Sequence, residues 1–75
     1  MTKVTMHSWR EGLKKVSLTH AQKELLGLNL KASKDNTDAL LDGKEIVFEI
    51  ENHATAILFC EKVEKLGVKC TFTLL

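Results

Sequence analysis

Glycine placement constrains the fold of this sequence more than any other feature. Gly27, Gly43 and Gly67 each follow a stretch in which apolar residues recur at helical spacing, and the chain contains no proline. A helix commonly ends at a residue with positive φ, a conformation that glycine adopts without steric cost. The three glycines therefore predict three helices, and the fourth, Gly12, predicts an early turn.

The three helices are expected to be amphipathic. Leu18, Ala21 and Leu25 recur at the spacing of one buried face in a first helix that begins near residue 15. Asn29 and Asn52 are suitable N-caps for the second and third helices. The predicted inward positions of the second helix are Leu30, Ser33, Thr37, Leu40 and Leu41, and those of the third are Ala56, Phe59, Cys60, Val63 and Leu66.

Three stretches alternate between polar and apolar residues, as half-buried strands do. They are TKVTMHSW at 2–9, EIVFEIE at 45–51 and VKCTFTL at 68–74. The predicted inward residues are Val4 and Met6 in the first, Ile46, Phe48 and Ile50 in the second, and Val68, Cys70, Phe72 and Leu74 in the third.

The order of elements is therefore β-α-α-β-α-β. A sheet with one apolar face needs one layer of helices to cover it. We expect an α+β two-layer sandwich, in which three helices cover one face of a three-stranded sheet, formed as a single domain by residues 1–75.

Residue types that support catalysis or metal binding are scattered along the chain. Cys60 and Cys70 are ten positions apart on different predicted elements, and the three histidines lie at positions 7, 20 and 53. Structural zinc sites need ligand pairs at close spacing, and a nucleophilic cysteine needs an exposed, electropositive setting with a base. We expect a protein that is not an enzyme and that has no metal site and no cofactor.

The sequence lacks the usual features of secreted and membrane proteins. Two cysteines are too few for the disulfide framework of a small secreted domain. No apolar stretch has the length of a signal-peptide core or of a membrane helix. We therefore expect two buried thiols, a cytoplasmic location and no membrane partner.

Charge is distributed unevenly, although the formal net charge is only +1. Residues 1–34 contain seven Lys or Arg and two Glu, which gives +5, whereas residues 35–75 contain four Lys and eight Asp or Glu, which gives −4. An exposed valine among the cations of the first helix suits an acidic protein partner, because charges steer association and apolar atoms add affinity. The alternative is an ordinary solvated helix face. The predicted partner-binding residues, called the basic face below, are Lys15, Val16, Thr19, His20, Lys23, Lys31 and Lys34.

Other surfaces offer competing interpretations. Trp9, Arg10, Lys14 and Lys15 have the composition of a module that stacks on and clamps RNA, although a tryptophan at a strand end also seals a core edge. The acidic second half of the chain is a third candidate contact surface. Leu58 falls on the charged side of the third helix, where a single exposed leucine is common.

One segment resembles a known family. Residues 15–38, KVSLTHAQKELLGLNLKASKDNTD, are similar to the C-terminal domain of the bacterial ribosomal stalk protein, in which a basic first helix precedes a GLGLKEAKD segment. Here that segment reads GLNLKASKD at 27–35, and KVEKLGVKCTF at 62–72 is similar to the family's closing LEEAGAxV run. The resemblance implies the β-α-α-β-α-β fold, which the adaptor of the Clp protease shares.

The resemblance also implies a binding surface. In the stalk family, the first helix and the start of the second recruit translational GTPases, and the matching positions are those of the basic face. Thr19 stands where the family has an aliphatic residue, and His20 where it has a lysine. The family's dimerisation domain and hinge have no counterpart here, so we expect an interaction module for a translation factor or ribosome component rather than the stalk itself. The degron-pocket residues of the Clp adaptor are replaced by Trp9-Arg10-Glu11 and Leu40.

Overall fold

The computed structural model describes all 75 residues of the chain. Its elements are β1 (Thr2–Trp9), α1 (Lys15–Leu26), α2 (Leu30–Leu41), β2 (Ile46–Ile50), α3 (His53–Leu66) and β3 (Val68–Leu74). The predicted α+β class and the β-α-α-β-α-β order are confirmed. Gly27 and Gly67 are the left-handed C-caps of α1 and α3, and the side chains of Asn29 and Asn52 cap α2 and α3, as predicted.

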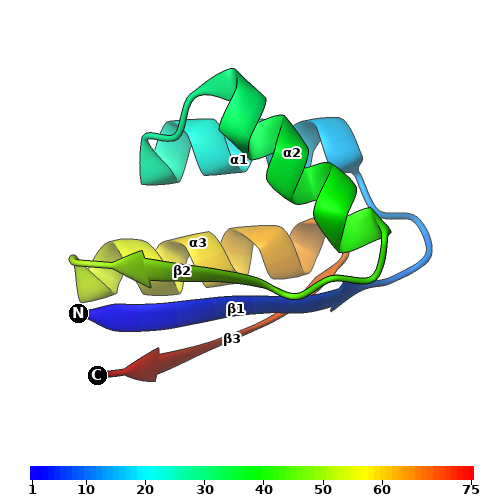
Figure 1. The fold of residues 1–75 in the computed structure, drawn as a ribbon. Helices are drawn as coiled ribbons and strands as arrows, with labels where there is room; N and C mark the ends of the chain where they lie inside the picture. The colour runs from blue at the N-terminus through cyan, green and yellow to red at the C-terminus, as the bar shows by residue number, and fades with distance from the viewer.

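The three strands form one antiparallel sheet in the order β2-β1-β3. All three helices lie on one side of it (Figure 1). α3 packs against the sheet along β3, and α2 crosses β1 and β2. α1 packs mainly on α2 and α3, so it lies further from the sheet than they do. The surface between α1 and α2 is therefore on the outside of the helical layer.

The core lies between α3 and the sheet. Phe59 and Val63 of α3 are fully buried, as are Val4 and Met6 of β1. Phe59 packs edge-to-face on Phe48 of β2, with ring centroids 5.6 Å apart. Leu18 and Ala21 of α1 are buried as predicted, and α2 adds one buried apolar side chain, Leu40, beside the buried polar side chains of Ser33 and Thr37.

Two parts of the predicted inward pattern are wrong. Phe72 and Leu74 are 43% and 63% exposed. Phe72 and Leu74 pair with Val4 and Thr2, which places them on the helical side of the sheet. They are exposed because β3 is an edge strand and because α3 only begins at His53, whose ring lies beside Phe72. Leu30, also predicted inward, is 54% exposed because it is the first residue of α2, at the end of that helix far from the sheet.

Candidate functional site

A surface cavity of about 220 Å³ lies between α1 and α2 and contains most of the basic face. Pockets for drug-sized ligands typically measure about 300 to 1,000 Å³, so this one has room for one or two side chains of a partner. We call it the α1–α2 groove. It is lined by Lys15, Val16, Thr19, His20, Leu30, Lys34, Thr37 and Asp38.

Five of the seven residues predicted from the sequence line the groove. These are Lys15, Val16, Thr19, His20 and Lys34. The other two lie outside it: Lys23 is exposed in the last turn of α1, and Lys31 forms an i,i+4 ion pair with Asp35 at 3.0 Å. The structure thus brings together the start of α1 and the middle of α2, and leaves Lys23 and Lys31 at the periphery.

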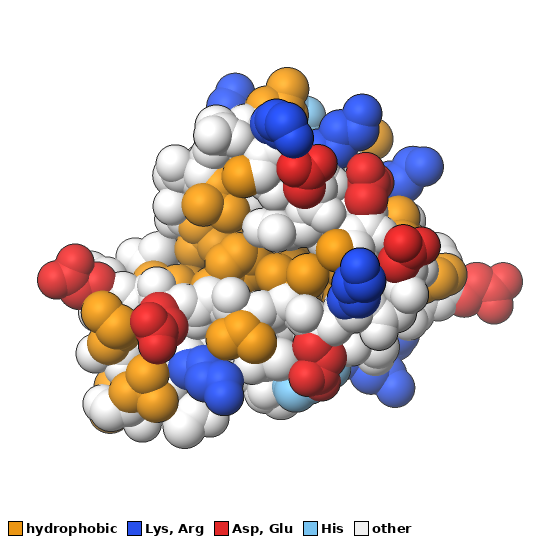
Figure 2. Space-filling view, viewed as in Figure 1, with side chains coloured by type: hydrophobic (Ala, Val, Ile, Leu, Met, Phe, Trp, Pro, Cys, Tyr) orange, Lys and Arg blue, Asp and Glu red, His pale blue; other side chains and the backbone are white.

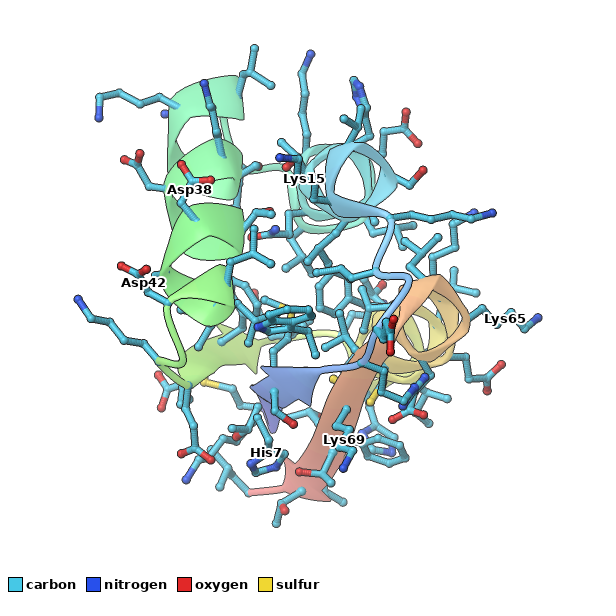
Figure 3. The ribbon with its side chains drawn as sticks, turned by 90° about the vertical axis from the view of Figure 1, so that its right-hand side faces the viewer. His7, Lys15, Asp38, Asp42, Lys65 and Lys69 are labelled. Carbon is cyan, nitrogen blue, oxygen red and sulfur yellow. The ribbon has the colours of Figure 1, made fainter.

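The rim of the groove combines apolar and charged groups. Val16 of α1 is 65% exposed and Leu30 of α2 is 54% exposed. Lys15 and Lys34 supply positive charge, and Asp38 is the one acidic residue in the lining. Figure 3 shows Lys15 and Asp38 on the two helices that bound the groove. Leu30 was missed as a site residue, because the sequence alone placed it on the inward side of α2.

Two threonines of the groove lining, Thr19 and Thr37, connect α1 and α2 through hydrogen bonds. The hydroxyls of Thr19 and Thr37 lie 2.9 Å apart and form a hydrogen bond across the two helices. Gln22 Nε2 donates to Thr37 Oγ1 at 3.0 Å, and Thr37 Oγ1 donates to the carbonyl of Ser33 at 3.1 Å. Thr37 therefore takes part in both side-chain hydrogen bonds between α1 and α2.

Two atoms of this interface have no hydrogen-bond partner. Gln22 Oε1 and Ser33 Oγ are both buried and unpaired. Gln22 was not predicted to be buried, although it lies four residues after Leu18 and therefore on the same helix face. Unpaired buried polar atoms are costly, so the α1–α2 contact is held less firmly than an apolar interface of similar size.

No protein-family model matches this chain, and no curated protein matches it. Functional inference therefore rests on the residues of the chain itself.

The side chains of the RNA-binding hypothesis have different surroundings. Arg10 Nη2 donates to the carbonyl of Glu64 at 2.5 Å, and its Nη1 lies 3.9 Å from the Glu64 carboxylate, so its guanidinium is held against α3. Lys15 lines the α1–α2 groove instead. Trp9 is 43% exposed at the end of β1. RNA binding stays a prediction, and quenching of Trp9 fluorescence by an oligonucleotide at low salt would support it.

The two cysteines are free and buried, as predicted. Burial raises the pKa of both thiols; the hydrogen bond between them raises the pKa of Cys70 further and lowers that of Cys60. Both thiols are therefore protonated, and neither is in the electropositive setting that activates a nucleophile.

The histidines lie at three separate places. His7 bridges the sheet, with Nδ1 2.7 Å from Glu45 Oε2 and Nε2 2.7 Å from Thr71 Oγ1. His53 Nδ1 lies 2.7 Å from Thr2 Oγ1, and His20 lines the α1–α2 groove. No group of three His, Cys, Asp or Glu side chains is arranged to hold a metal ion. None of the helices is long and apolar enough to cross a membrane.

Leu58 is 54% exposed and lines a separate cavity of about 230 Å³ between α1 and α3. Its neighbours there include Glu24 and Lys62, which carry opposite charges. This cavity has no excess of either charge, whereas the lining of the α1–α2 groove has two lysines and one aspartate and so suits an acidic partner better.

Proposed function

We propose that this chain is a non-catalytic protein-interaction module that binds an acidic segment of a partner protein in the α1–α2 groove. The observation that carries the proposal is the groove itself, in which exposed Val16 and Leu30 lie beside the cations Lys15 and Lys34. An apolar side chain of the partner would fill the cavity, and acidic residues on either side of it would lie near the two lysines.

The two kinds of group have different roles in this proposal. The apolar atoms of Val16 and Leu30 would supply affinity when they are buried, at about 25 cal/mol per Å² of apolar surface removed from water. The lysines would steer the partner and set its orientation. Lys23 and Lys31 lie outside the groove, so they would act mainly on the association rate, and their effect would weaken with salt.

A translation factor or a ribosome component is the partner that the resemblance to the ribosomal stalk domain supports. Five of the eight residues that line the groove are at positions that correspond to the binding positions of that family, namely Lys15, Val16, Thr19, His20 and Lys34. A cytoplasmic location fits such a partner. The replacements at Thr19 and His20 alter the middle of the groove, so partner choice is proposed to differ in detail from that of the stalk domain.

Affinity capture from a native lysate with matched charge reversals tests this proposal. The test variant is Lys15→Glu/Lys34→Glu, and the control is Lys62→Glu/Lys65→Glu, which changes the net charge equally at exposed positions of α3. We expect one or more proteins to be captured by the wild type and the control and reduced at least about tenfold with the test variant, a loss equivalent to about 1.4 kcal/mol. Equal capture by the two variants would contradict binding in the groove.

A further inference from the structure

A second surface of the molecule, at the free edge of β2, has features that the proposed function does not use. β2 is an edge strand, since it pairs with β1 on one side only. Apart from the pairing with β1, residues 46–51 form no backbone hydrogen bond in a turn, loop or cap. No side chain forms a hydrogen bond with their backbone. The outward N–H and C=O groups of β2 are therefore available to another strand.

The hydrogen-bond pattern of the sheet identifies which N–H and C=O groups of β2 point outward. The amide of Leu75 donates to the carbonyl of Met1 at 2.9 Å, so the odd-numbered residues of β1 bond to β3. Hydrogen-bonding direction alternates along an antiparallel strand, so the even-numbered residues of β1 bond to β2. Their partners are Ile46, Phe48 and Ile50. The amides and carbonyls of Val47 and Glu49 therefore point away from the sheet.

An apolar groove lies on the helical side of this edge. It has a volume of about 470 Å³, and its apolar lining includes Leu25, Leu26 and Leu28 from the end of α1 and the loop after it, with Phe48 and Ile50 from β2. We call it the β2 groove. Figure 2 shows hydrophobic side chains gathered in the hollow between the upper helices and the sheet. Side chains of an added strand that pointed to the helical side would enter this hollow.

Acidic residues lie on the other side of the same edge. Glu49 and Glu51 are exposed and line the rim of the β2 groove, and Val47 between Glu45 and Glu49 is 52% exposed. Glu45 is bound to His7, and Lys3 is the cross-strand neighbour of Glu49 but forms no ion pair with it. Glu49 and Glu51 thus retain unpaired negative charge beside the free strand edge.

From these features we infer that the β2 edge binds an extended basic segment of a partner protein as a fourth strand. Such a segment would exchange backbone hydrogen bonds with Val47 and Glu49. Because side chains alternate along a strand, apolar residues at every second position would fill the β2 groove, and Lys or Arg between them would lie over the acidic side. The partner is thus opposite in charge to the one proposed for the α1–α2 groove.

A second copy of the chain fits this edge less well. Pairing β2 with β2 of another copy would bring two rows of glutamates together, and like charges on neighbouring strands destabilise a sheet. Pairing β2 with β3 of another copy would use a free edge on each side, but it would generate an open-ended assembly rather than a closed dimer. The chain alone is therefore expected to sediment as a monomer, and oligomers formed through either edge would overturn the inference.

The test uses the full ¹⁵N-labelled chain and a synthetic seven-residue peptide, acetyl-Lys-Val-Lys-Ile-Lys-Val-Lys-amide. We expect amide shifts at residues 46–51 and at Leu28, with hydrogen exchange slowed at Val47 and Glu49, whose amides face the added strand. A peptide of the same sequence with N-methyl groups on the amides that face β2 should bind at least tenfold more weakly, because it cannot complete the ladder. Equal binding of the N-methylated peptide would overturn strand addition.

A matched pair of variants tests the charge. Glu49→Lys should weaken peptide binding about tenfold or more, whereas Glu61→Lys, an equal change at an exposed position of α3, should leave it within twofold of the wild type. Equal effects of the two variants, or shifts confined to the α1–α2 groove or to β3, would show that the peptide does not bind at this edge.

Discussion

Two of the helical interfaces of this small domain differ in chemistry. Between α3 and the sheet, fully buried apolar side chains such as Phe59 and Val63 meet Val4 and Met6. Between α1 and α2, the buried contacts include Gln22, Ser33 and Thr37. A fully buried apolar side chain contributes roughly 1.5 to 3 kcal/mol, whereas a neutral hydrogen bond contributes about 1 kcal/mol net and an unpaired buried polar atom costs about 1 to 3 kcal/mol. Stability is therefore concentrated in the α3–sheet interface, and the α1–α2 surface carries the candidate binding site.

The largest expected effect lies in the apolar interface. Phe59→Ala should lower the free energy of unfolding by about 3 to 5 kcal/mol, because it removes a fully buried ring that packs on Phe48. Phe72→Ala, at an exposed edge position, should cost less than about 1 kcal/mol. Urea denaturation followed by circular dichroism measures both, and equal losses would contradict a core centred on α3.

A smaller loss is expected at Thr37, which is hydrogen-bonded to two residues of α1. Thr37→Val keeps the side-chain shape but removes the oxygen that accepts from Gln22 Nε2 and bonds to Thr19. Gln22 Nε2 would then keep only its longer hydrogen bond to the carbonyl of Leu18, at 3.4 Å, so we expect a cost of about 1 kcal/mol. The same denaturation measurement applies. A loss as large as that of Phe59→Ala would mean that the polar interface, not the apolar one, dominates stability.

The buried thiols add a pH dependence to the apolar interface. Burial raises the pKa values of Cys60 and Cys70 in the folded state above the ordinary thiol value of 9.0. Below pH 9.0 the thiols are protonated in both the folded and the unfolded state, so they do not change the free energy of unfolding. Above it the thiols of the unfolded chain lose their protons first, so stability falls as the pH rises. We expect a loss of about 1 kcal/mol from Cys70 by pH 10, and a further loss of the same sign from Cys60. Denaturation from pH 8 to 10 should show a shallower decline in Cys60→Ala/Cys70→Ala, and identical slopes would contradict the assignment.

The smallest expected effect has the opposite sign. Ser33→Ala removes a buried hydroxyl that has no hydrogen-bond partner and introduces a better helix former. The free energy of unfolding should rise by up to about 1 kcal/mol. Thr37→Val removes a hydrogen-bonded polar group and Ser33→Ala an unpaired one, so the two variants compare these cases in one interface. A clear loss of stability in Ser33→Ala would show that Ser33 Oγ has a hydrogen-bond partner in solution.

The sequence predicted the helices and strands well because the interactions that begin and end them are made by neighbouring residues. Positive φ at a helix end favours glycine, and Asn29 and Asn52 cap helices through their own side chains. Alternation placed Phe72 on the correct side of the sheet, but it does not reveal whether a helix extends over that part of the strand. Coverage depends on tertiary packing, which is why Phe72 and Leu74 are exposed.

The sequence predicted only part of the candidate site, because the site also depends on tertiary packing. Helical spacing identified the outward face of α1, but the way two helices cross decides which outward residues meet. That crossing places Lys34 and Leu30 in the groove and leaves Lys23 and Lys31 outside it. Gln22 could have been found from its spacing to Leu18, because residues four apart lie on the same face of a helix.

The most direct measurement is the dissociation constant of the captured partner for the wild type and for Val16→Ser/Leu30→Ser. Both residues are exposed, so the variant should keep its stability within about 0.5 kcal/mol, and its net charge is unchanged. Binding in the α1–α2 groove predicts a Kd at least about tenfold higher for the variant, since each side chain loses most of its apolar contact. An unchanged Kd would show that the partner binds elsewhere on the molecule.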